Sequence, residues 1–118
     1  MSPKEELDQV NLAIRLGHTV TGCCEWHEAA FRRVQQDPEM AGLTPAAIRK
    51  LTIEFVLAGG IIGQLKEQRP EYNDHDFYYK VILSVPEFAH ELFVEIRLAD
   101  SDVDCPTVLL VNAHPQRK

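Results

Sequence analysis

The sequence predicts an α+β domain in which three helices precede a four-stranded antiparallel sheet. Before Gly59-Gly60, apolar residues recur at helical spacing, whereas after it they alternate every second residue in four short runs. A period of about 3.6 followed by a period of 2 indicates helices first and then strands. Because no linker or repeat interrupts the chain, we expect residues 1–118 to form one domain, with a helical part at 1–58 and a sheet at 61–114.

The first predicted helix begins after Ser2 and ends at Gly17. Ser2 is placed as the N-cap, Pro3 as the first helical residue, and Glu5 completes a capping box. Apolar residues at spacings of three and four follow, and Gly17 is expected to supply a left-handed stop.

The second predicted helix runs from Cys23 to Gln36 and ends at Asp37-Pro38, since the residue before a proline avoids helical angles. Its apolar face is expected to carry Cys23, His27, Ala30 and Val34. The third predicted helix begins at the cap Thr44 and ends at Gly59-Gly60. It is apolar on most sides, which predicts a central helix packed across the sheet.

The strands are expected at 61–68, 77–85, 92–98 and 107–113, joined as a meander. The first is expected at an edge of the sheet, because Gly63 and Lys66 weaken it. The alternation of 77–85 and 92–98 separates an inner apolar face from an outer polar one. The last strand is apolar on both faces, which predicts a central or covered strand.

Composition limits the function classes. The 118 residues carry a net charge of −6, which argues against non-specific nucleic-acid binding through bulk charge. No apolar run approaches the roughly 20 residues of a membrane span, and the acidic N-terminus is unlike a signal peptide. We therefore expect a cytoplasmic protein without membrane contact, whose three cysteines stay reduced.

His27 is the first candidate for chemistry, because an imidazole on an apolar helix face can be tuned to act as general acid or base. The alternative is a core histidine bonded to a backbone carbonyl. Cys23 and His27, four apart, could bind one metal ion with His18 and Cys24, but buried cysteines more commonly act as small hydrophobes. We assign no metal ligand and no cofactor.

The outer face of the sheet is the second candidate. The residues expected there are Tyr78, Lys80, Glu95 and Arg97, with Asn112 and His114 at the end of the last strand. Lys80 and Arg97 suit a phosphate, while Glu95 or a histidine could move a proton. The alternative is a solvated face with cross-strand ion pairs. The segment Asn73-Asp74-His75-Asp76 is interpreted as the polar tip of a connection.

In its layout the chain resembles the compact toxin-type ribonucleases of the barnase, colicin and RelE-like grouping. The resemblance covers about residues 27–114. It is carried by His27 with Arg32 and Arg33, by Gly42-Leu43-Thr44 opening a helix with Arg49, and by the final Val111-Asn112-Ala113-His114.

That resemblance implies metal-independent cleavage of RNA, in which the 2′-hydroxyl attacks the adjacent phosphate. His27 or His114 would act as base or acid, and Lys80, Arg97 or Arg32 would stabilise the charge of the phosphorane. The residues expected to bind substrate are Arg32, Tyr78, Glu95 and Asn112. The chain departs from the grouping in its acidity, because such toxins are commonly basic.

A non-catalytic binding or assembly module is the alternative hypothesis. In that case the protein is expected to be a homodimer whose sheet face or edge strand meets a protein partner, with Tyr78, Ile82 and Phe93 of the outer face as interface residues. The two hypotheses differ in whether His27 and His114 face one cleft together with Arg97.

Overall fold

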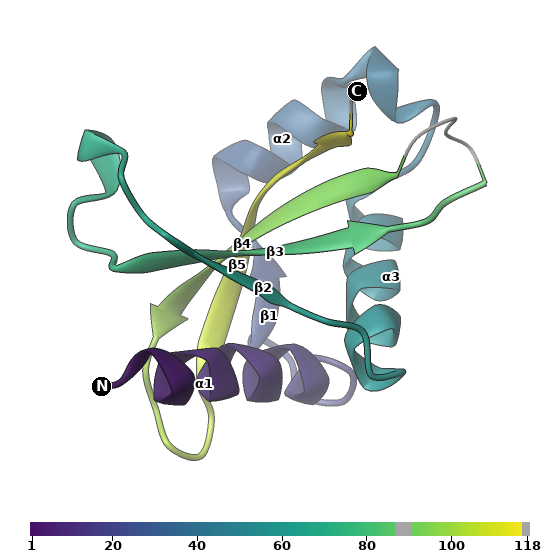
Figure 1. Ribbon diagram of the computed structural model, residues 1–118. Helices are drawn as coiled ribbons and strands as arrows, with labels where there is room; N and C mark the ends of the chain where they lie inside the picture. Colours follow the sequence, from purple (N-terminus) through teal and green to yellow (C-terminus); the bar gives the residue numbers. More distant parts are fainter. Residues whose placement is uncertain (87–90, 117–118) are drawn as a thin grey trace.

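The computed structural model describes residues 1–86 and 91–116 and confirms the α+β class (Figure 1). Its helices are α1 (Pro3–Leu16), α2 (Glu28–Gln36) and α3 (Pro45–Leu57), with short 3-10 turns η1 (Pro38–Met40) and η2 (Pro70–Tyr72). Its strands are β1 (Cys24–Trp26), β2 (Gly63–Lys66), β3 (Phe77–Leu83), β4 (Leu92–Asp100) and β5 (Thr107–Pro115). They form one mixed sheet in the order β1-β5-β4-β3-β2.

The strand β1 corrects the prediction of four antiparallel strands. It pairs parallel to β5, with Cys24 opposite Val108 and Trp26 opposite Leu110, so the predicted helix from Cys23 begins only at Glu28. The backbone edge of β5 requires hydrogen-bond partners, and β1 supplies them. This pairing overrides the helical spacing of residues 23–27, which is therefore coincidental.

Helices α1 and α3 cover the inner face of the sheet, as predicted for α3 (Figure 1). The buried core between them includes Val10, Ile14, Ile48, Val56, Tyr79, Val81, Val94, Ile96 and Leu110. Helix α2 instead packs along β5. The predicted alternation of β3 and β4 is confirmed on this inner face, and β2 lies at the expected edge.

The outer face is less open than predicted. The connection from β2 to β3, residues 67–76, which we call the arm, contains η2 and contributes Glu67 and Arg69 to contacts with β4. Glu95 and Arg97 point to this face, yet their side chains are only 7% and 4% exposed. The arm therefore converts part of a polar sheet face into a buried polar layer.

Gly17 has a different role from the predicted left-handed stop. Its φ of −57° is ordinary right-handed backbone. A Cβ built on Gly17 would lie 2.6 Å from the Cβ of Cys24, so glycine permits the end of α1 to contact β1. Arg49 joins the same two segments, because its Nη2 donates to the Gly17 carbonyl at 3.0 Å and its Nε donates to the Cys24 carbonyl at 2.6 Å.

No helix within residues 1–86 and 91–116 is long and apolar enough to cross a membrane.

Replacing Gly17 with alanine is expected to lower the free energy of unfolding by about 1–3 kcal/mol, because the new methyl group overpacks the α1–β1 contact. Urea denaturation measures the change. The control is a double-mutant cycle with Cys24→Gly, which removes the opposing Cβ and should recover part of the loss. Additive effects of the two substitutions would contradict a direct clash.

Candidate functional site

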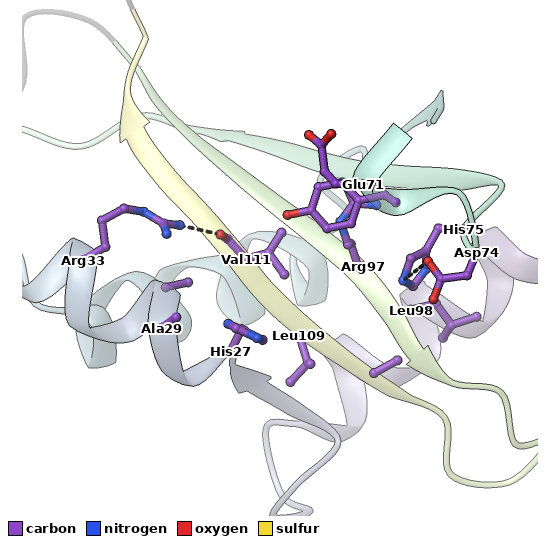
Figure 2. Close-up of a pocket in the computed structure, with 13 residues that line it drawn as sticks. His27, Ala29, Arg33, Glu71, Asp74, His75, Arg97, Leu98, Leu109 and Val111 are labelled. Carbon is purple, nitrogen blue, oxygen red and sulfur yellow. Dashed lines mark hydrogen bonds and ion pairs between the residues drawn. The ribbon is translucent and has the colours of Figure 1, made fainter. Parts of the chain in front are cut away.

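A pocket of about 520 Å³ lies over the outer face of β4 and β5, between α2 and the arm (Figure 2). Its lining residues are His27, Ala29, Ala30, Arg33, Glu71, Tyr72, Asp74, His75, Arg97, Leu98, Ala99, Leu109 and Val111. Figure 2 shows His27 and Arg33 on one side of β5, and His75 with Asp74 on the other. The pocket thus combines an apolar floor with charged and titratable groups on both walls.

His27 lies at the junction of β1 and α2. It is the N-cap residue of α2, with extended backbone angles, and not a member of an apolar helix face as the sequence suggested. Its backbone N–H donates to the Leu110 carbonyl at 2.9 Å, which continues the pairing of β1 with β5. The side chain is exposed and makes no capping hydrogen bond, so its imidazole is available to a ligand in the pocket.

Arg33 fixes α2 to the edge of β5. Beyond the end of the short β1, the Val111 carbonyl accepts a hydrogen bond from Arg33 Nη2 at 2.8 Å. This contact supplies a partner for an edge carbonyl and keeps a guanidinium at the rim of the pocket.

The arm supplies the second wall. The backbone N–H of His75 donates to the Tyr72 carbonyl at 3.0 Å, which brings the two side chains together, with ring centroids 6.4 Å apart. The Nε2 of His75 lies 3.9 Å from Asp74 Oδ1, and the imidazole is 29% exposed. A second histidine therefore lines the same pocket as His27.

Arg97 is held beneath the arm by ion pairs, and together with Glu67, Arg69 and Glu95 it forms an ionic cluster in which all members but Arg69 are buried. Its Nη2 donates to Glu67 and, at 3.1 Å, to Glu95. Arg69 also contacts both glutamates, at 3.0 Å to Glu67 and 2.8 Å to Glu95. The Tyr72 ring stacks over the Arg97 guanidinium, with its centroid 3.6 Å from Cζ. The four formal charges balance, so the cluster as a whole is neutral.

The remaining N–H groups of Arg97 are buried without a partner in the part of the chain that the structure describes. Among the described residues, Nε and Nη1 of Arg97 have no hydrogen-bond partner, although the side chain is 4% exposed and lines the pocket. Buried donors of this kind require an acceptor, and leaving them unpaired costs about 1–3 kcal/mol. Both nitrogens are shielded from solvent, with the Tyr72 ring stacked on the guanidinium, so an oxygen atom reaches them only if a neighbouring group moves. An anionic oxygen would then give the strongest hydrogen bond.

The ionic cluster shifts the titration of Glu67. Hydrogen bonds from the Arg69 side chain, and then from the Arg69 backbone and Arg97, lower the pKa of Glu67 to about 2. Hydrogen bonds to Glu67 and Glu95 in turn raise the pKa of Arg69. Glu67 and Arg69 therefore both stay ionised over the ordinary range of pH.

Of the residues predicted from sequence, the pocket brings together only His27 and Arg97. Glu95 belongs to the ionic cluster, and Tyr78 lies against it, with its ring centroid 5.0 Å from Arg69 Cζ. Lys80 lies opposite Gly63 and Glu95 in the sheet, outside the pocket lining.

The other predicted residues are also absent from the pocket lining. His114 is exposed and stacks on Phe93, with ring centroids 4.9 Å apart, and Asn112 pairs with Glu95 in the ladder. Arg32 pairs with Glu28 at 2.5 Å on the exposed side of α2. His114 lies outside the pocket that His27 and Arg97 line, so the convergence of all three residues that the ribonuclease hypothesis required is not found. A second proton-transfer group would have to come from another residue.

The sequence interpretation missed the contribution of the arm, above all His75 and Tyr72. His75 was predicted to lie in a polar turn, and the structure confirms the turn. A turn prediction, however, gives no information on whether the arm packs over β4. The available signal was charge complementarity: Glu67 and Arg69, just after β2, carry charges opposite to those of Arg97 and Glu95 on β4, which they contact in the structure.

Cys23 and His27 do not share a helix, which removes the geometric basis of the metal hypothesis. Within residues 1–86 and 91–116, no group of three or more histidine, cysteine or acidic side chains is arranged to bind a metal ion.

Comparison with known proteins gives no further assignment. No protein-family model, curated protein or solved structure matches this chain.

The stability of the fold should depend on pH through Glu67. A carboxyl whose folded pKa of about 2 lies below its ordinary value of 4.5 stabilises the fold above pH 4.5, and that contribution is lost as pH falls toward 2. Glu67→Gln should lower the free energy of unfolding at neutral pH. It should also reduce the fall of that free energy between pH 4.5 and about 2, as measured by urea denaturation at each pH. Glu28→Gln, which removes an exposed ion pair on α2, is the control and should change neither. If the loss of stability on acidification is the same in Glu67→Gln as in the wild type, Glu67 is not the group responsible.

Proposed function

We propose that the protein is a metal-independent endoribonuclease whose active site is the pocket between α2 and the arm. The observation that carries the proposal is that His27 and His75 line this pocket from its two walls, together with Arg33 and Arg97. Cleavage of RNA by its own 2′-hydroxyl needs a base, an acid and a stabiliser of the developing negative charge. The pocket contains side chains for all three tasks.

In the proposed reaction, one histidine accepts the proton of the 2′-hydroxyl while the 2′-oxygen attacks the adjacent phosphorus. The bond from phosphorus to the 5′-oxygen breaks, and the other histidine donates its proton to the leaving oxygen. The products are a 2′,3′-cyclic phosphate and a 5′-hydroxyl, so atoms and protons balance. Exchange of protons with water then restores both imidazoles.

Arg97 is suited to stabilising the phosphorane because it is already oriented. Tyr72 and the two glutamates fix the orientation of its guanidinium, whose Nε and Nη1 have no hydrogen-bond partner among the described residues. These two nitrogens are buried, so a neighbouring group has to move before a phosphate oxygen can accept hydrogen bonds from them. Since Glu67 and Glu95 balance the charges of Arg97 and Arg69, Arg97 contributes mainly through hydrogen bonds. Arg33, at the rim, adds a positive charge without a carboxylate partner among the described ion pairs.

The remaining lining fits a nucleotide. Leu109 and Val111 form an apolar floor against which a base or ribose can pack. The carboxylates of Glu71 and Asp74 repel a polyanion at the arm side of the pocket, and the net charge of −6 acts in the same direction. The substrate is therefore a short stretch of single-stranded RNA bound locally, and not a duplex held along an extended basic surface.

RNA cleavage in the presence of EDTA tests this function. His27→Ala and His75→Ala should each lower the cleavage rate by about 10²–10⁴-fold, because each removes a proton-transfer group. His18→Ala is the matched control, since His18 lies in the turn after α1 and outside this pocket, and its rate should not change. Product analysis should find 2′,3′-cyclic phosphate ends.

The variant His114→Ala separates the pocket from the site implied by the family resemblance. Cleavage that depends on His114 and not on His75 would contradict the pocket as the active site. Absence of cleavage by the wild-type chain across a range of pH and salt would overturn the ribonuclease proposal itself. In that case the homodimeric binding module, which is still a prediction, would be the hypothesis to pursue through the oligomeric state.

A further inference from the structure

We propose that Cys23 and Cys105 are a modification site, a dithiol that low-molecular-weight disulfides such as oxidised glutathione convert to an intramolecular disulfide. Their Sγ atoms lie 3.1 Å apart although the residues are 82 positions apart in the sequence. Cys23 is buried directly before β1, and Cys105 is exposed in the loop between β4 and β5. This inference is independent of the proposed ribonuclease activity.

Backbone contacts on both sides determine the proximity of the two thiols. The Cys23 carbonyl accepts a hydrogen bond from the Val108 N–H at 2.9 Å, which registers the start of β1 against β5. In the loop, Asp102 Oδ1 accepts two hydrogen bonds, from the backbone N–H of Asp104 at 2.8 Å and from the backbone N–H of Cys105 at 3.1 Å. Because both backbones are fixed, the sulfurs meet in the folded chain and not through a chance side-chain position.

Formation of the bond requires only a small movement. A disulfide has an S–S length of about 2.05 Å, so the sulfurs must approach by about 1 Å, which small side-chain rotations can provide. Neither β1 nor β5 needs to leave the sheet.

Cys24 provides an internal contrast. It is completely buried in the core on the opposite face of β1, and burial raises the pKa of its thiol to about 12. The hydrogen bond to Cys105, followed by burial, raises the pKa of Cys23 as well. Cys105 is the exposed thiol, so it is the one that meets an external disulfide first.

The chemistry is a two-step thiol–disulfide exchange. The Cys105 thiolate attacks one sulfur of the external disulfide, forming a mixed disulfide and releasing one thiol. Cys23 then loses its proton to solvent and attacks the Cys105 sulfur, and the second external thiol leaves. The two protein thiols are oxidised by two electrons, and the external disulfide is reduced to two thiols.

The crosslink would fix the short edge strand β1 to the loop before β5. Since His27 directly follows β1, the disulfide would stabilise the segment that presents it. Closure of so long a loop restricts the unfolded chain, and a rise in Tm on the order of 10 °C is expected.

The test incubates the native full-length chain in reduced and oxidised glutathione at defined ratios, followed by alkylation under denaturing conditions and intact-mass analysis. The wild type should lose two alkylation sites and two hydrogen atoms, with no glutathione retained, and its Tm should rise. Cys24→Ala should behave in the same way. Cys105→Ser, at an exposed position, should fold, retain two reduced thiols and show no rise in Tm.

The Cys24→Ala variant also assigns the bond, because Cys23 and Cys24 lie on one tryptic peptide between Arg15 and Arg32. Its digest should contain Cys23 linked to Cys105. Loss of the disulfide in Cys24→Ala, its retention in Cys105→Ser, or accumulation of a stable mixed disulfide with glutathione in the wild type would each overturn the proposal.

Discussion

The ionic cluster of Glu67, Arg69, Glu95 and Arg97 holds the arm on the outer face of the sheet, and the pocket exists only because the arm lies there. Two glutamates and one arginine of this cluster are almost fully buried, so each charge depends on the others. Removing one partner of such a buried network commonly costs about 3–5 kcal/mol, because it leaves an uncompensated charge. The cluster thus links the stability of the arm to the geometry of the candidate active site.

The sequence was sufficient for features that depend on local periodicity. Alternation defined β3 and β4, and the capping residues Ser2 and Thr44 defined the starts of α1 and α3, since both side chains accept the expected backbone hydrogen bonds. Strand β1 could not be found in this way. Only three residues long, it exists because β5 offers it an edge, and the residues of β5 that pair with it come 84 positions later in the chain, as for Cys24 and Val108.

The candidate site was predicted only in part, because some of its side chains are positioned by contacts between residues far apart in the sequence. Arg97 could be placed on the outer face from alternation, and His27 could be identified as a titratable group near apolar residues. The position of His75 depends on how the arm folds back, which is determined by contacts between distant charged residues. His114 follows the predicted strand but contacts Phe93 instead of the pocket.

The most direct measurement is a titration of the protein, labelled in its histidine side chains, with a 2′-deoxy-substituted oligonucleotide that binds without being cleaved. NMR resonances of the His27 and His75 imidazoles should shift together along one binding curve, while those of His18 and His114 stay constant. Saturable binding that shifts His114 without His27 or His75 would contradict the proposed placement of an active site between α2 and the arm.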